Sequence, residues 1–137
     1  MSGAAVVDAS VALAWILPGD EAEAALSLRE RAANEPSLGL RVPPIFWYEV
    51  GNVLWQAVRR GRIGHPDAAA ALEALRAFAI ETRPADVMAC LELAVASGVS
   101  VYDTSYLVLA LEASIPLWTL DRGLAAAATA AGVQVEP

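Results

Sequence analysis

Four acidic residues in this sequence either follow short apolar runs or lie near the start of longer apolar stretches. They are Asp8, Glu49, Asp103 and Asp121. Ionised carboxylates within a few ångströms repel by several kcal/mol at protein-like dielectric, so either their pKa values rise or a cation lies between them. Oxygen ligands with no histidine or cysteine nearby favour Mg²⁺ or Mn²⁺ over zinc. If the fold brings the four acids together, the pattern predicts a magnesium site at which Mn²⁺ can substitute.

A magnesium site of this kind acts on phosphorus. The ion holds phosphate oxygens, lowers the pKa of a bound water and stabilises the charge of in-line displacement, so no side-chain nucleophile is required. Two hydroxyl groups stand close to the acids in the sequence: Ser10 lies two residues after Asp8, and Thr119 lies two before Asp121. Each could order a bound water or a carboxylate. For each, the alternative is a hydrogen bond to the local backbone.

Each acid also has a simpler explanation. Asp8, Asp103 and Asp121 stand at the start of predicted helices, where an N-cap would contribute ~1 kcal/mol. Glu49 is compatible with the solvent face of an amphipathic helix. A cap explains Asp121 nearly as well as a metal does, so the joint placement of all four acids carries the prediction.

The elements that must position the acids are inferred from apolar runs and from the residues that bound them. Strands are expected at residues 4–7, 38–42, 79–82 and 133–135, and directly before Asp121. Helices are expected at 11–17, from 20 to about 33, from Pro43-Pro44 to about 60, from a cap at Asp67 to about 78, at 84–97, from 101 onwards, and at about 124–131.

This alternation predicts an α/β fold, a three-layer sandwich in which helices flank both faces of a central parallel sheet of four to five short strands. No internal repeat or linker divides the chain, so a single domain is expected over residues 1–137. In a parallel sheet, the carboxyl ends of strands and the N-termini of helices share one edge, where such folds bind ligands. That edge would collect all four acids.

The composition limits the possible classes of protein. The chain has 137 residues, 57% of them hydrophobic, and a net charge of −7; all nine basic residues are arginine. This acidic balance argues against non-specific nucleic-acid binding, although it leaves room for a local site. Cys90 is the only cysteine, so the chain has no disulfide framework and no cysteine metal motif, which fits a reducing cytoplasm. No apolar stretch approaches the ~20 residues that span a bilayer, so no membrane role is expected.

Four segments carry a resemblance to a known family. In order and spacing, the chain resembles the acidic motifs of PIN-domain ribonucleases, in particular the VapC toxins of bacterial and archaeal toxin–antitoxin pairs. The segments are VVDASVALAWILPGDE, PPIFWYEVGNVLW, VYDTSYLVLALE and PLWTLDRGLAAAATAAGV, and they span nearly the whole sequence. The resemblance implies a PIN-like fold in which the four acids hold the metal, with Ser10 and Asn52 as supporting polar groups.

The same resemblance implies an activity and partners. A VapC-type protein would be a Mg²⁺-dependent endoribonuclease in which a metal-activated water attacks the RNA phosphodiester. It would form a homodimer and be inhibited by a cognate antitoxin whose C-terminal segment covers the site. Some relatives carry a further acid just after the fourth one, whereas Arg122, Gly123 and Leu124 offer none here. The choice between one and two metal ions therefore stays open.

Two other hypotheses compete with the nuclease. A catalytically silent PIN-like binding module would keep the fold and the antitoxin surface without cleaving RNA. A receiver-like phosphoacceptor domain would also cluster aspartates around Mg²⁺, but such domains use a lysine to neutralise the phosphoryl group, and this sequence has none.

A basic cluster and four tryptophans remain. Arg59, Arg60 and Arg62 could contact RNA phosphates or an acidic partner, or could simply be solvated. The tryptophans lie in apolar runs and are expected in the core. For Trp47 and Trp55, contact with a dimer partner or an antitoxin is the alternative.

Overall fold

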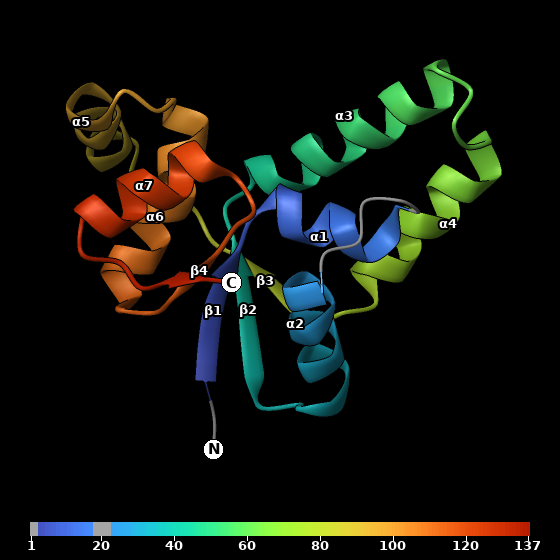
Figure 1. Ribbon diagram of the computed structural model, residues 1–137, viewed down its shortest axis with the longest axis horizontal. Helices are drawn as coiled ribbons and strands as arrows, with labels where there is room; N and C mark the ends of the chain where they lie inside the picture. Colours follow the sequence, from blue (N-terminus) through green and yellow to red (C-terminus); the bar gives the residue numbers. More distant parts are fainter. Residues whose placement is uncertain (1–2, 18–22) are drawn as a thin grey trace.

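The computed structural model describes residues 3–17 and 23–137, which form a five-stranded sheet with helices on both sides (Figure 1). The strands are β1 (Gly3–Val7), β2 (Leu38–Val42), β3 (Ile80–Thr82), β4 (Leu117–Trp118) and β5 (Val135–Glu136). The helices are α1 (Ala9–Ile16), α2 (Glu23–Asn34), α3 (Ile45–Arg59), α4 (His65–Arg76), α5 (Val87–Ser97), α6 (Val101–Ala113) and α7 (Arg122–Ala130).

All strand pairs are parallel, and the strand order is β3-β2-β1-β4-β5. The central strand β1 pairs with β2 on one side and β4 on the other, with Val6 opposite both Arg41 and Leu117. From β1 the chain first builds outward through β2 and β3, and only later adds β4 and β5 on the other side. The strand order therefore reverses between β1 and β4, which is where open α/β sheets place their ligands.

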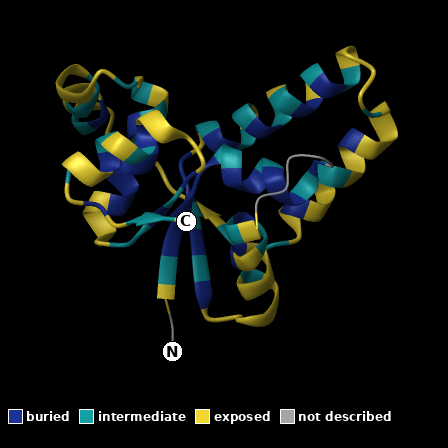
Figure 2. Cartoon of the chain, viewed as in Figure 1, coloured by how far each residue is buried: buried dark blue, intermediate teal, exposed yellow. Residues whose placement is uncertain are grey.

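The layers are those of an α/β sandwich, as predicted. Helix α6 packs across β1, β2 and β4, while α5 and α7 pack against α6. Figure 1 shows α1 to α4 on the other side of the sheet, where α1 contacts α2, α3 and α4. Buried residues gather on the sheet and the inner sides of α1 and α6, whereas α4 and α5 expose much of their surface (Figure 2).

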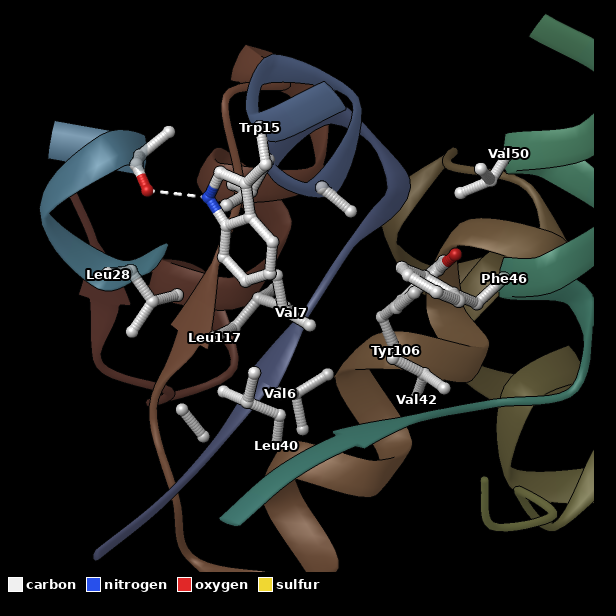
Figure 3. Packing of buried hydrophobic residues seen from close by; sticks show 14 of the residues in the cluster. Val6, Val7, Trp15, Leu28, Leu40, Val42, Phe46, Val50, Tyr106 and Leu117 are labelled. Carbon is white, nitrogen blue, oxygen red and sulfur yellow. Dashed lines mark hydrogen bonds between the residues drawn. The ribbon is translucent and has the colours of Figure 1, made fainter. Parts of the chain in front are cut away.

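The core explains why β1 is so apolar. Val6 and Val7 are fully buried, which suits β-branched side chains between two helical layers. Beside them, the indole N–H of Trp15 donates to the Ala25 carbonyl at 2.6 Å and so joins α1 to α2 (Figure 3). The Trp15 ring also packs on Phe78, with centroids 5.3 Å apart. Trp15 is thus a core residue, as expected.

Three predicted boundaries are wrong, each because a different hydrogen bond is made. Gly64, not Asp67, is the N-cap of α4, so Asp67 lies in the first turn of that helix. Helix α5 begins at Val87 rather than at residue 84, because Asp86 caps it by accepting from the Met88 N–H at 3.3 Å. The last strand starts at Val135 rather than at residue 133, because the Val133 N–H still bonds to the Ala128 carbonyl of α7.

The other elements lie close to their predicted positions, and β2 matches its prediction residue for residue. The predicted start of the second helix, at residues 20–21, lies outside the described residues. Within the described part of the chain, no single helix is long and apolar enough to cross a membrane. Among the described helices, only α5 and α6 taken together reach that length and apolar composition, and they are bent by 112° relative to each other.

Candidate active site

Asp8 lies at the carboxyl end of β1, next to the point where the strand order reverses. It caps α1, because its Oδ1 accepts from the Val11 N–H at 3.2 Å. The same oxygen accepts from the Ser10 hydroxyl at 2.5 Å, and Oδ2 accepts from the Thr119 hydroxyl. Asp8 is only 5% exposed. The expected cap is therefore present, and the carboxylate is also held in a network that a cap does not require.

The two hydroxyls join Asp8 to the segment that follows β4. Ser10 Oγ accepts from the Leu120 N–H at 2.9 Å, and Thr119 Oγ1 accepts from the Asp121 N–H at 3.0 Å. Thr119 therefore makes the local backbone bond considered for it and also orders a carboxylate. Ser10 donates to the nearby Asp8 carboxylate and accepts from the backbone N–H of Leu120, which is distant in sequence. Both hydroxyls fix the ends of β1 and β4 relative to each other.

Asp121 caps the last helix. Its Oδ1 accepts from the Leu124 N–H at 3.0 Å, and its backbone is extended, as a cap requires. A Cβ on Gly123 would lie 3.3 Å from the same oxygen, which is tighter than ordinary van der Waals contact. Glycine at position 123 thus leaves room for the Asp121 carboxylate.

Asp103 lies in the first turn of α6 but does not cap it, so the N-cap considered for Asp103 from the sequence is wrong. The cap is Ser100, whose Oγ accepts from the Asp103 N–H at 3.1 Å. Because the hydroxyl of Ser100 serves the helix end, the Asp103 carboxylate is not needed there. Its position in the first turn still places it where the helix dipole favours negative charge.

Glu49 is held by a residue that the sequence did not reveal. The Tyr106 hydroxyl of α6 donates to Glu49 Oε1 of α3 at 2.5 Å. Tyr106 is 1% exposed, and Figure 3 shows it beside Phe46 with its hydroxyl directed towards α3. A buried tyrosine needs a hydrogen-bond partner. Its spacing of three from Asp103, which puts both on one side of α6, was the available signal.

Burial and mutual repulsion act on the carboxylates. The pKa of Asp8 is raised, first by burial and further by the charge of Asp121, against the lowering effect of its hydrogen bonds. The pKa of Glu49 is raised by burial and by the charges of Asp103 and Asp8, although the Tyr106 bond opposes this. The pKa of Asp103 is raised by burial and by the charge of Asp121. Each of the four predicted acids therefore lies within electrostatic reach of two of the others.

The donor set fits a hard cation. The four acids offer only oxygen, and several close carboxylates with raised pKa values are what a divalent ion would relieve. Across residues 3–17 and 23–137, no three His, Cys, Asp or Glu side chains already surround one point as a metal cage. Mg²⁺ keeps several waters in its coordination shell, so carboxylates can hold it without closing a cage around it.

Asn52 lies beside Glu49 on an open pocket. It is exposed on α3, three residues after Glu49, and the two side chains line a pocket of about 400 Å³. Ile45, Tyr48 and Tyr102 complete the lining. Asn52 therefore shares a pocket with one of the predicted acids, Glu49.

Arg59, the first residue of the basic cluster, lies away from Glu49 and Asn52. Arg59 ends α3, ten residues from Glu49, which is roughly 15 Å along the helix axis. Its guanidinium lies 4.8 Å from the centroid of the Trp55 ring, and Trp55 is 53% exposed, so the core position expected for Trp55 is wrong. Trp47 is half-buried, and its indole N–H donates to Thr82 Oγ1 at 2.9 Å.

Comparison with known proteins agrees with this geometry. Residues 5–130 match the PIN domain family. Ribonuclease VapC3 from Pyrobaculum aerophilum is 36% identical over 124 residues, which are 88% of this chain and 91% of that protein. The crystal structure of PAE2754, also from Pyrobaculum aerophilum, superposes with a TM-score of 0.75 at 24% identity, covering 98% of this chain and 90% of that one. VapBC2 from Rickettsia felis, bound to a DNA fragment from its promoter, superposes with a TM-score of 0.66 at 9% identity, covering 97% of each chain.

The match to the family model and the parallel sheet with acids near its switch point agree on the class of protein. The chain belongs to the PIN-domain family. Within that family, its 36% identity to a VapC ribonuclease makes it a VapC-type member.

Proposed function

We propose that this protein is a Mg²⁺-dependent endoribonuclease and the toxin of a toxin–antitoxin pair. The observation that supports the proposal is the electrostatic interaction that links Asp8, Glu49, Asp103 and Asp121, in which burial and neighbouring acids raise the pKa values of Asp8, Glu49 and Asp103. The similar protein from Pyrobaculum aerophilum is named a ribonuclease, which supports RNA as the substrate.

The chain's own side chains have distinct roles in this proposal. The four acids would hold the ion, and Mn²⁺ would substitute for Mg²⁺; when bound, the ion supplies charge for the phosphate oxygens and acidifies a water. Ser10 and Thr119 hold Asp8 in one orientation through their hydroxyls. Tyr106 does the same for Glu49. Because these donors are buried or partly buried, the carboxylates are positioned before any ligand arrives.

The proposed partners are an antitoxin and a second copy of the chain, acting in the cytoplasm. The similarity to the VapBC2 structure supports the antitoxin. Support for a homodimer comes from α5, which exposes apolar side chains along one side: Val87, Met88, Leu91 and Val95. Exposed apolar surface of this kind is typical of contacts between proteins.

Cleavage of a labelled RNA in Mg²⁺, compared with the same reaction in EDTA, tests the activity. Asp8→Asn should fold but fail to cut. The matched control is Asp67→Asn, which changes an exposed acid in the first turn of α4 and should cut at the wild-type rate. Full activity in Asp8→Asn would remove the proposed site.

A catalytically silent binding module is the remaining candidate, favoured by the absence of a ready-made metal cage in the described part of the chain. Titration with Mn²⁺ separates the two. If the acids converge on an ion, a concentration one hundred times Kd stabilises the protein by ~2.7 kcal/mol. An unchanged melting temperature together with no cleavage would establish the silent module.

A further inference from the structure

Two exposed tyrosines flank the acids. Tyr48 is 74% exposed in the first turns of α3, and Tyr102 is 64% exposed in the first turn of α6. Each directly precedes a site acid, Glu49 in one helix and Asp103 in the other. Large aromatic side chains that are this exposed, in pairs and beside a site, indicate contact with a ligand.

The two tyrosines share one groove. Both line the pocket of about 400 Å³ that also contains Glu49 and Asn52. A second, largely apolar pocket of about 190 Å³ shares Tyr102 and Ile45 with the first and continues past Pro43 to Val87. The shared lining therefore extends from Glu49, an acid of the site, past both tyrosines onto an apolar surface.

The chemistry of this groove suits unpaired nucleobases. Bases of single-stranded RNA stack on aromatic side chains, and stacking tolerates any sequence because every base has a π-face. Neither pocket is lined by an arginine from the described residues, so phosphate pairing does not supply affinity there. The neighbouring acids repel phosphates as well. The faces of the bases are therefore the groups that this part of the groove can bind, whereas the phosphate oxygens would be held at the acidic site by the ion.

We infer that Tyr48 and Tyr102 form a base-stacking platform that holds unpaired nucleotides of RNA beside the acidic site. RNA as the occupant rests on the proposed function, whereas the platform itself rests on the two exposed rings and the groove they share. The bases that the two rings hold must be unpaired. A continuous duplex cannot offer its base faces to the rings, because they are stacked within the helix.

The test is RNA binding in the Asp8→Asn background, so that bound RNA survives. Fluorescence anisotropy measures the affinity for a short single-stranded RNA and for the duplex of the same sequence, in Mg²⁺. Tyr48→Ala and Tyr102→Ala should each weaken single-strand binding by roughly 5- to 150-fold. Tyr48→Phe and Tyr102→Phe keep the ring and should retain the affinity. Trp55→Ala, which removes an exposed aromatic further along α3, is the control and should bind as the parent does.

Several results would overturn the inference: unchanged affinity in both alanine variants, equal losses in the phenylalanine and alanine variants, or equal binding of single strand and duplex. Loss of dimerisation or antitoxin binding in the alanine variants with RNA affinity intact would assign the groove to a protein partner instead. Cleavage by the wild-type chain is scored separately. Cleavage with no tyrosine dependence of binding removes the platform and leaves the nuclease, whereas tyrosine-dependent binding without cleavage removes the nuclease and leaves the platform.

Discussion

The hydroxyl of Thr119 donates to the buried carboxylate of Asp8, across 111 positions of sequence. The same hydroxyl accepts from the Asp121 N–H at 3.0 Å, so one side chain joins the ends of β1 and β4 and orients two of the four acids. Ser10 makes a second bridge by donating to Asp8 and accepting from the Leu120 N–H. The acidic edge is therefore tied together by two small hydroxyl side chains.

Replacing Thr119 by valine should weaken folding. The change keeps a similar shape but leaves the Asp8 carboxylate and the Asp121 N–H each without one partner, and an unsatisfied buried group costs about 1–3 kcal/mol. Urea unfolding of Thr119→Val measures the loss. Thr129→Val, at an exposed position in α7, is the control and should unfold close to wild type. Equal midpoints for all three proteins would show that the Thr119 bonds contribute nothing to stability.

Stability of the metal-free protein should rise on acidification from neutral pH. Burial and repulsion raise the pKa of Asp8, Glu49 and Asp103, so the folded state binds protons more tightly than the unfolded state does. Stability from these groups is fully present below the unfolded pKa, ~4, and is lost as pH rises through the higher folded values. Thermal unfolding between pH 4 and 7 measures the slope.

The variant Glu49→Gln tests how much the Glu49 charge contributes to this dependence of thermal stability on pH. It removes one of the repelling charges and keeps an oxygen for the Tyr106 hydroxyl to bond. The variant should melt at a higher temperature than wild type at pH 7, and its melting temperature should vary less with pH. A steeper dependence, or a lower melting temperature at pH 7, would mean that the Glu49 charge is stabilising in the folded protein.

Tyr106→Phe should change the Glu49 carboxyl group. The tyrosine hydroxyl lowers the pKa of Glu49 against the raising effects of burial and of Asp103 and Asp8, so its removal should move the pKa of Glu49 further upward. Carbon NMR of the glutamate side chains, titrated without metal, measures this. The aromatic ring remains, so the free energy of unfolding should fall by only about 1 kcal/mol. A Glu49 titration unmoved by Tyr106→Phe would show that the bond is absent in solution.

Two substitutions at Asp121 separate its cap from its charge. Asparagine caps helices as well as aspartate does, so Asp121→Asn should keep wild-type stability, whereas Asp121→Ala should cost about 1 kcal/mol. If the carboxylate also serves the site, both variants should lose RNA cleavage. Full cleavage by Asp121→Asn would make Asp121 a structural cap alone.

The sequence was sufficient for the sheet and its layers, and it predicted that the acids share one edge of the sheet. Apolar runs and helix boundaries place Asp8 and Asp121 at strand ends, and parallel topology alone then brings strand ends and helix starts to one edge. Capping was harder to foresee. Ser100 rather than Asp103 caps α6, and Gly64 rather than Asp67 caps α4, because several polar residues near each helix start compete for the same N–H groups.

The contacts between the acids and their supports could not be predicted in the same way. Tyr106 appears in the sequence as one apolar residue among many in α6, and its bond to Glu49 depends on how α6 and α3 pack across 57 positions. Trp55 appears in an apolar run, yet it is exposed because α3 extends beyond the sheet together with α4 (Figure 1). The spacing of three between Asp103 and Tyr106 puts both on one side of α6, but a single sequence does not reveal which residue of another helix that side contacts.

The central claim is that four carboxylates form one metal site: the N-caps of α1 and α7, Asp8 and Asp121, together with Glu49 of α3 and Asp103 of α6. The most direct test is a Mn²⁺ titration in which electron paramagnetic resonance measures the concentration of the free ion. It is carried out on the wild-type protein and on four variants: Asp8→Asn, Glu49→Gln, Asp103→Asn and Asp121→Asn. We predict that the wild type binds Mn²⁺ and that each substitution weakens binding by at least about tenfold. Wild-type affinity in all four variants, or no binding by the wild type, would contradict the claim.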